Sequence, residues 1–143
     1  MIRVVVVADS GAVFASLTAA VRTVPGAYIV RHASSSAPLD RVLATLEVDL
    51  VLVGDLLSPD DALARLAETR RAAPAAKVVM LSSSPEASWL ADALRAQASA
   101  VLPGRLEPDT LGLVLREVLE TGAAVVPFPE RAADVRPATG AAA

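Results

Sequence analysis

The sequence predicts a parallel α/β sheet that is covered by helices on both faces. Short apolar runs rich in valine recur along the chain, each bounded by turn-forming residues and followed by a longer stretch rich in Ala and Leu. Continuous apolar strands are typical of parallel sheets that are buried on both faces. Hydrophobic residues make up 54% of the 143 residues, enough for one domain to offset the entropy lost on folding.

The first half of the chain is predicted to alternate strands with helices. Four consecutive valines mark the first strand, and the helix after it ends before the turn dipeptide Pro25-Gly26. The second helix is short, with Ser36 as its expected N-cap. These elements are strands at 3–8, 27–32 and 49–54 and helices at 12–23 and 38–46.

Helix start and stop signals are clearest in the second half. Ser58 precedes Pro59 at the first helical position, where the missing proline N–H costs nothing. Ser84-Pro85-Glu86 repeats this pattern, and Gly122 is the expected left-handed terminator of the last helix. These elements are helices from Ser58 to about 72, from Ser84 to about 97 and from Glu107 to 122, and strands at 77–82 and 100–102.

Five strand–helix units with short connections require right-handed crossovers. The prediction is therefore a doubly wound, flavodoxin-like (βα)5 sheet with strand order 2-1-3-4-5 and helices on both faces. Residues 1–126 form the expected domain. Residues 127–143 are rich in Pro and Ala without periodicity, which predicts a linker or tail, one that leads to an effector domain outside this chain.

Composition excludes several functional classes. The chain has no cysteine and a single histidine, which excludes disulfides, thiol nucleophiles and most zinc chemistry. A net charge of -3 argues against direct nucleic-acid binding. No run of about 18 apolar residues occurs, so neither a membrane span nor export is predicted, and the cytoplasm is the expected compartment.

In a doubly wound sheet the site is expected at the carboxyl ends of the strands. Ala8-Asp9-Ser10 follow the first predicted strand, Gly54-Asp55 end and follow the third, Ser82-Ser83 end and follow the fourth, and Pro103-Gly104-Arg105 follow the fifth. With this order of elements, the chain over residues 2–126 resembles the receiver domain of two-component response regulators. Short segments are similar to the branch that precedes a LuxR-type helix-turn-helix: Ile2-Arg3-Val4, Ala93-Leu94-Arg95-Ala96 and Glu107-Pro108-Asp109.

The resemblance implies a set of phosphorylation residues. It makes Asp55 the candidate phosphoacceptor, with Asp9 and Asp55 as carboxylates for Mg²⁺. Ser82 would contact the phosphoryl oxygens, and Arg105 would replace the usual lysine. Such a site works by positioning and by cations that neutralise the transferring oxygens.

The sequence departs from that pattern at several strand ends. Ala8 replaces one of two adjacent acids, and the lysine position falls on Gly104, while the only lysine, Lys77, begins the fourth strand. Two ways of locating the phosphoacceptor position disagree. In the family a proline follows the aspartate by four residues, so counting back from Pro59 selects Asp55. The family usually has Pro-Asp where this chain has Val48-Asp49, and counting forward from there selects Gly54. An extra residue held as a bulge at Gly54 would reconcile the two counts.

Simpler structural roles compete with each functional one. Asp55 is also explained as a turn aspartate and Asp9 as the cap of the first helix. Ser82 to Ser84 are explained as a loop and helix cap, and Trp89 as a core residue or interface anchor. His32 is expected at an edge of the sheet. Arg65, Arg70 and Arg71 are expected on a solvated helix face.

The leading hypothesis is a degenerate receiver, a pseudo-receiver that controls an effector, expected to be transcriptional, through protein contacts or dimerisation rather than catalysis. The expected contact faces are the first and fifth helices, or the fourth and fifth helices with the fifth strand, with Leu106 and Leu113 as exposed apolar residues. The alternative is a working Mg²⁺-dependent phosphoacceptor served by a histidine kinase. A third reading is a flavodoxin-like protein that binds an anionic ligand, disfavoured for flavin because the aromatic residues Phe14, Tyr28, Trp89 and Phe128 are predicted away from the strand ends.

Overall fold

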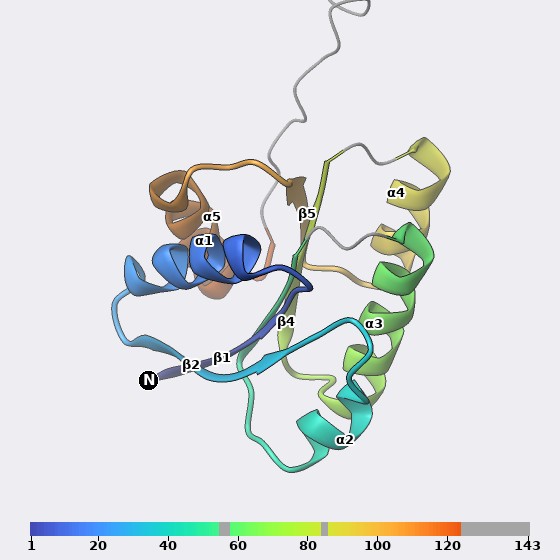
Figure 1. The fold of residues 1–143 in the computed structure, drawn as a ribbon, viewed down its shortest axis with the longest axis horizontal. Helices are drawn as coiled ribbons and strands as arrows, with labels where there is room; N and C mark the ends of the chain where they lie inside the picture. The colour runs from blue at the N-terminus through green and yellow to red at the C-terminus, as the bar shows by residue number, and fades with distance from the viewer. Residues whose placement is uncertain (55–57, 84–85, 124–143) are drawn as a thin grey trace, which may run out of the picture.

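The computed structural model describes residues 1–54, 58–83 and 86–123. Five parallel strands form one sheet in the order β2-β1-β3-β4-β5, which confirms the predicted fold and strand order (Figure 1). The elements are β1 (Ile2–Val7), α1 (Gly11–Arg22), β2 (Ala27–Ala33), α2 (Leu39–Ala44), β3 (Leu50–Val53), α3 (Pro59–Ala72), β4 (Lys77–Ser82), α4 (Ala87–Arg95), β5 (Ala100–Pro103) and α5 (Pro108–Thr121). The predicted tail at 127–143 lies outside the described residues.

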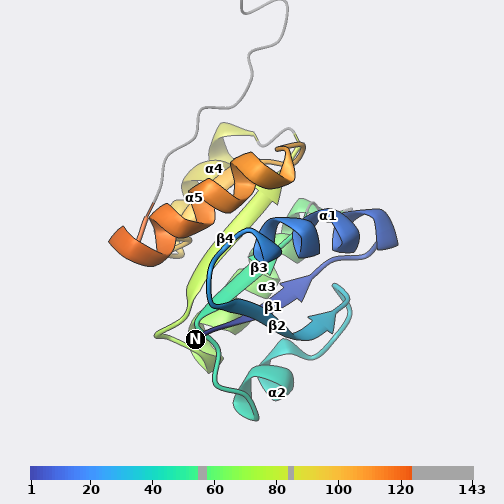
Figure 2. The same ribbon diagram turned by 90° about the vertical axis from the view of Figure 1, so that its left-hand side faces the viewer.

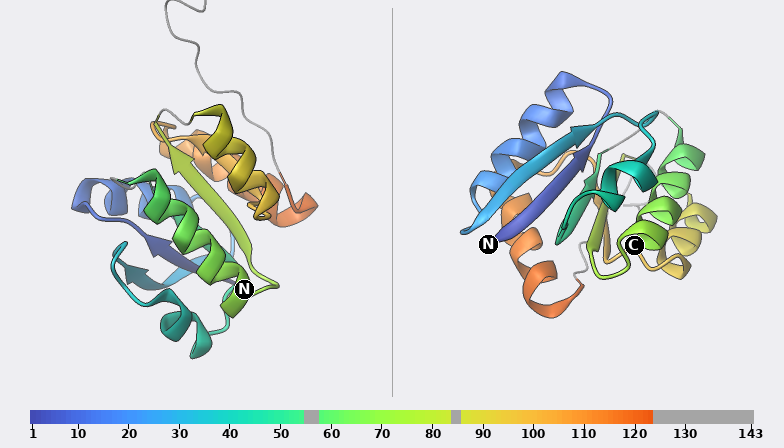
Figure 3. Two further views of the ribbon diagram at one scale, coloured as in Figure 1. Left: turned by 90° about the vertical axis from the view of Figure 1, so that its right-hand side faces the viewer. Right: turned by 90° about the horizontal axis from the view of Figure 1, so that it is seen from below.

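Helices cover both faces of the sheet, α1 and α5 on one side and α2, α3 and α4 on the other (Figures 2 and 3). Strand side chains alternate between the two layers. In β3, for example, Leu50 and Leu52 pack with α1 and α5, whereas Val51 and Val53 pack toward α2, α3 and α4. This double burial explains why the central strands, such as β3, are continuous apolar runs. Among the described helices, none is long and apolar enough to cross a membrane.

The third strand pairs regularly with both of its neighbours. Val53 lies opposite Val7 on one side and Met80 on the other, and neither pairing shifts register. The N–H of Gly54 then donates to the Val7 carbonyl oxygen at 2.7 Å. The expected bulge at Gly54 is therefore wrong. The register shift lies instead between Val4 and Val5, in the pairing of β1 with the edge strand β2.

Two predicted helix termini are confirmed, and one is corrected. Ser58 accepts a hydrogen bond from the Asp61 N–H at the start of α3, and Gly122 has a left-handed φ of 91° at the end of α5. Ser36 does not cap α2. The cap position is Pro38, which has no side-chain bond, and the Ser36 hydroxyl lies 3.0 Å from that of Ser34.

The two helices on the first face pack closely because α5 has a glycine at the crossing. A Cβ built on Gly112 would lie 1.8 Å from Thr23 Oγ1 and 3.2 Å from the Ala20 carbonyl oxygen. Thr23 is fixed there, since its hydroxyl donates to the same Ala20 oxygen at 2.7 Å. A side chain at position 112 would therefore separate α1 from α5.

Candidate functional site

The end of β1 holds a buried methyl followed by an exposed carboxylate. Ala8 is 1% exposed, and its N–H donates to the Ala33 carbonyl oxygen. Asp9 Oδ1 accepts the backbone N–H of Ser35, in the β2–α2 loop, at 2.8 Å. The sequence suggested Asp9 as the cap of α1, but Ser10 caps this helix by accepting the Val13 N–H. Asp9 instead fixes the loop that follows β2.

The end of β3 packs directly against the end of β1. A Cβ built on Gly54 would lie 3.3 Å from the Ala8 Cβ and 2.8 Å from Val13 Cγ1. The structure therefore leaves no free space for a side chain at position 54 unless the Val13 side chain moves. The candidate phosphoacceptor Asp55 lies outside the described residues.

The ends of β4 and β5 are held together by the backbone. The Gly104 N–H donates to the Ser82 carbonyl oxygen at 3.1 Å. Ser82 is half-buried and its side chain faces α3 and α4, in the same layer as Met80. Arg105 is exposed in the turn after β5, and the structure describes no hydrogen bond or ion pair for its side chain.

The described residues supply one carboxylate at the strand ends where the resemblance places Mg²⁺. Mg²⁺ requires oxygen ligands in near-octahedral geometry, usually with one or two carboxylates. Within residues 1–54, 58–83 and 86–123, no three His, Asp or Glu side chains gather closely enough to hold a metal ion. At the facing ends of β1 and β3, Asp9 is the one described carboxylate, and Ala8 and Gly54 supply none.

A small groove beside this edge is apolar, and it contains one of the predicted interface residues. It has a volume of about 160 Å³ and lies between α1 and the turn before α5. Leu106 lines this groove and packs against the α1–α5 core. The expectation that Leu106 is exposed is therefore wrong, because the turn after β5 folds its side chain inward. The groove residues are Ala12, Val13, Ser16, Leu17, Leu81, Gly104, Leu106 and Leu111.

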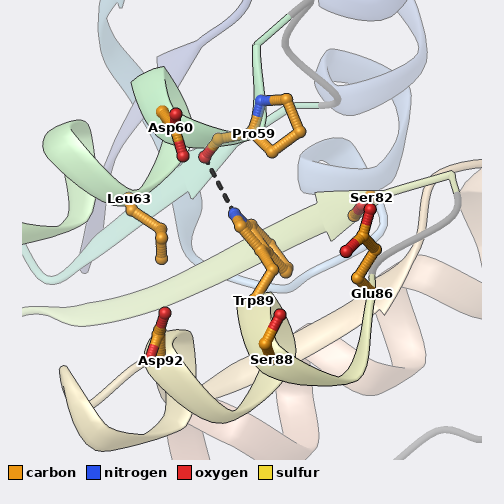
Figure 4. Close-up of a pocket in the computed structure, with 8 residues that line it drawn as sticks. All are labelled: Pro59, Asp60, Leu63, Ser82, Glu86, Ser88, Trp89 and Asp92. Carbon is orange, nitrogen blue, oxygen red and sulfur yellow. Dashed lines mark hydrogen bonds between the residues drawn. The ribbon is translucent and has the colours of Figure 1, made fainter.

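A larger pocket of about 330 Å³ lies between α3 and α4 (Figure 4). Trp89 of α4 lines it, and the indole Nε1–H donates to the Pro59 carbonyl oxygen at the start of α3, at 2.8 Å. Ser82 at the end of β4 also lines the pocket. The expectation that Trp89 lies away from the strand ends is therefore wrong, although it is a core residue with 8% exposure. No sequence pattern indicates this pocket, since Trp89 and Pro59 are 30 residues apart along the chain.

A polar connection links Asp9 to helix α3. The Ser35 residue that donates its N–H to Asp9 also accepts a hydrogen bond from Arg65 Nη1 through its carbonyl oxygen. Arg65 Nη2 pairs with Glu68 Oε2 at 2.9 Å, and both side chains are mostly buried. Arg65 was expected on a solvated face, but α3 packs beside α2 and the loop before it.

The other two arginines of α3 differ from each other. Arg70 donates to the carbonyl oxygens of Pro74 and Ala76 at 2.6 Å each, so it fixes the turn before β4 rather than lying free in solvent. Arg71 is exposed, as expected. Amphipathic spacing predicts only which side of a helix is exposed. It does not show which long side chains fold back onto the backbone.

Two leucines and the histidine lie on the surface. Leu113 of α5 is 64% exposed, which confirms its predicted exposure, and Leu94 of α4 is 55% exposed. His32 is exposed on the edge strand β2, as predicted, with its ring centroid 4.8 Å from that of Phe14.

The resolved pKa shifts lie at the opposite end of the sheet, where the strands begin. Asp49 Oδ2 accepts the backbone N–H of Arg3 at 2.8 Å and its Nε–H at 3.3 Å. These bonds hold the pKa of the Asp49 carboxyl below its usual value and raise that of Arg3. This pair joins the start of β1 to the start of β3 and lies far from the strand ends that form the candidate site.

Comparison with solved structures identifies the architecture. The receiver domain of a CheY-like protein from Methanospirillum hungatei JF-1 superposes with a TM-score of 0.72 at 21% identity, covering 84% of this chain and 94% of that one. A LuxR family DNA-binding response regulator from Silicibacter pomeroyi gives 0.71 at 23%, covering 89% and 98%. The non-phosphorylated receiver domain of RcsB from Escherichia coli gives 0.73 at 16%, covering 90% and 98%. The fold is that of a receiver domain.

No protein-family profile matches the sequence. A search of curated proteins likewise gives no match. The receiver fold is thus established by structure at identities of 16–23%. The strand-end residues of this receiver fold are Ala8, Asp9, Gly54, Ser82, Gly104 and Arg105.

Proposed function

We propose that this chain is a pseudo-receiver, a signalling domain that acts through protein contacts rather than through efficient phosphoryl transfer. The observation that supports this most directly is the packing of Gly54 against Ala8 and Val13, where a carboxylate site would need space. Charge is missing as well. An opposite unit charge 4 Å from a phosphoryl oxygen is worth about 4 kcal/mol at an effective dielectric near 20, and Gly104 offers none.

The remaining described carboxylate, that of Asp9, already accepts a backbone hydrogen bond. Asp9 holds the Ser35 N–H, and Ser35 in turn holds Arg65. A cation at Asp9 would compete with that backbone hydrogen bond. This arrangement favours a structural role for Asp9, in which it stabilises the β2–α2 loop.

Self-association is the proposed mode of contact. Leu113 and Leu94 are the large apolar side chains that α5 and α4 leave most exposed. The solved neighbours include LuxR family DNA-binding regulators, which supports a transcriptional effector as the output partner. In light scattering over a concentration series, Leu113→Ser is expected to shift the protein toward monomer, and the matched control Leu119→Ser tests for lost packing instead. A monomer at all concentrations in the parent protein would contradict the dimer.

The phosphorylation hypothesis is tested by titration with Mg²⁺ and beryllofluoride, which mimics an acyl phosphate. Amide shifts of Asp9, Ser82 and Gly104 in isotope-labelled protein are the measurement. We expect no saturable shifts. Saturable shifts that disappear in Asp55→Asn but persist in Asp61→Asn would overturn the proposal and establish the alternative, a phosphoacceptor at Asp55 that takes its phosphoryl group from a histidine kinase.

A further inference from the structure

The pocket between α3 and α4 has the size of a ligand site and a lining of mixed chemistry. Its volume of about 330 Å³ is within the usual range for small-molecule sites, about 300–1,000 Å³. Figure 4 shows side chains converging on it from the start of α3, from the end of β4 and from two turns of α4. They are Pro59, Asp60, Leu63, Ser82, Glu86, Ser88, Trp89 and Asp92.

The indole of Trp89 gives the pocket a rigid aromatic wall. The residue is 8% exposed and packs in the core of the α2–α4 face. Its Nε1–H is satisfied by the Pro59 carbonyl oxygen at 2.8 Å, which fixes the ring across the gap between the two helices. The aromatic wall is therefore preorganised, because the core packing and this hydrogen bond already fix the ring.

The charged groups of the pocket all have one sign. Asp60, Glu86 and Asp92 supply carboxylates, Ser82 and Ser88 supply hydroxyls, and none of the described lining residues is basic. Asp92 is paired with Arg95, through Oδ1, at 2.7 Å on the exposed side of α4. For Asp60 and Glu86 the structure describes no ion pair. Positions at the starts of α3 and α4 suit acids through the helix dipole, but that effect does not require them to share a cavity with an indole.

We propose that this pocket binds a compact organic cation, an alkylguanidinium or alkylammonium group. A cation beside an indole gains the strongest of the cation–π interactions, and the gain is larger where water is partly excluded. The several N–H donors of a guanidinium match carboxylate and hydroxyl acceptors arranged around it. An anion would meet only like charge. This proposal is independent of phosphorylation, since no strand-end residue except Ser82 takes part.

Occupation of the pocket would connect two helices that otherwise share few contacts. The ligand would touch α3 through Asp60 and α4 through Glu86 and Trp89. Because α4 and β5 border the face that carries Leu94, the bound cation would stiffen the framework of that face. The site thus provides a route by which a small cation or a basic side chain could be sensed without phosphoryl transfer.

The experiment titrates the full chain with n-butylguanidinium and, separately, with a blocked Ala-Arg-Ala peptide. Neutral N-butylurea and the corresponding citrulline peptide are the matched probes. Trp89 is the only tryptophan, so its fluorescence and the shift of its indole N–H report directly on the pocket. We expect saturable changes with the cationic probes only. Binding of butylguanidinium indicates a free cation as the source, and binding of the peptide alone indicates an arginine of a partner protein.

Charge variants separate pocket binding from general attraction to an acidic protein. Asp60→Asn combined with Glu86→Gln should weaken binding about tenfold or more, since both charges lie at the site. Asp40→Asn combined with Asp109→Asn changes the net charge equally, on first-turn acids of α2 and α5 outside the pocket, and should change affinity less than about twofold. Circular dichroism checks that each variant is folded. Equal losses in both double variants, equal response to the neutral probes, or no saturable response would overturn the proposal.

Discussion

The two faces of the sheet are built differently. On the α1–α5 face the layer is apolar and tightly packed, with Gly112 seated against Thr23. On the α2–α4 face the helices are joined by polar links, such as Trp89 to Pro59 and Arg65 to Ser35, and they leave a pocket of about 330 Å³. Close apolar packing resists small changes in shape, whereas directional polar links fix a gap and leave it open. The second face is therefore the one suited to hold a ligand.

The largest expected effect is on the α2–α4 face, from Trp89→Ala. Removing the indole deletes a large buried side chain and leaves the Pro59 carbonyl oxygen without its donor, so unfolding free energy should fall by about 3–5 kcal/mol. Trp89→Phe keeps most of the packing and should cost about 1–2 kcal/mol. Urea denaturation followed by circular dichroism measures both. Equal losses in the two variants would mean that the hydrogen bond, not the ring volume, dominates.

Gly112→Ala tests the close packing of the other face. The new methyl would collide with Thr23 Oγ1 and the Ala20 carbonyl. Overpacking costs about 1–3 kcal/mol, partly offset by the better helix propensity of alanine. Gly11→Ala is the control, because a Cβ there meets nothing within 4 Å, and it should not destabilise the protein. A neutral Gly112→Ala would mean that α5 moves away from α1 at little cost.

Arg65→Met tests whether the polar link on α3 stabilises the fold. The variant leaves Glu68 mostly buried without its partner, and the Ser35 carbonyl loses its donor. We expect a loss of about 1–3 kcal/mol. Arg71→Met on the exposed side should change stability by less than about 0.5 kcal/mol. A further Glu68→Leu exchange should restore part of the loss, and failure to do so would locate the effect in the Ser35 bond alone.

Local patterns predicted most of the fold. Apolar runs located all five strands within one residue at each end, most clearly in the central strands, where burial on both faces favours apolar side chains. Ser58-Pro59 and Gly122 located helix ends because their effects act within a turn. Ser36 does not cap α2 because the cap position falls on Pro38, two residues later.

The candidate site was less predictable because its contacts are long-range. Nothing in the spacing of Asp9 reveals that its partner is the Ser35 N–H, 26 residues away. The sequence predicts that Leu106 is exposed, but the turn after β5 folds it over the α1–α5 core. It predicts Trp89 as a core residue or interface anchor, but not its hydrogen bond to Pro59 of α3. Periodicity gives the face of a helix, whereas a site depends on which helix lies opposite.

The smallest expected effect concerns Arg3 and Asp49, at the end of the sheet where the strands begin, which has no proposed function. The backbone N–H and side chain of Arg3 hold the pKa of the Asp49 carboxyl below its usual value. Since the folded pKa is the lower one, the stabilisation is complete above the unfolded value and is lost as pH falls through the folded one. Asp49→Asn keeps an acceptor for the backbone N–H but loses the charge. Because the side chain is 38% exposed, the loss near neutral pH should be about 0.5 kcal/mol. Chemical denaturation over a pH series from 7 into acid checks this: the difference between parent and variant should shrink as the carboxyl of the folded protein is protonated. A difference that stays constant over the series would assign the effect to hydrogen-bond geometry instead of charge.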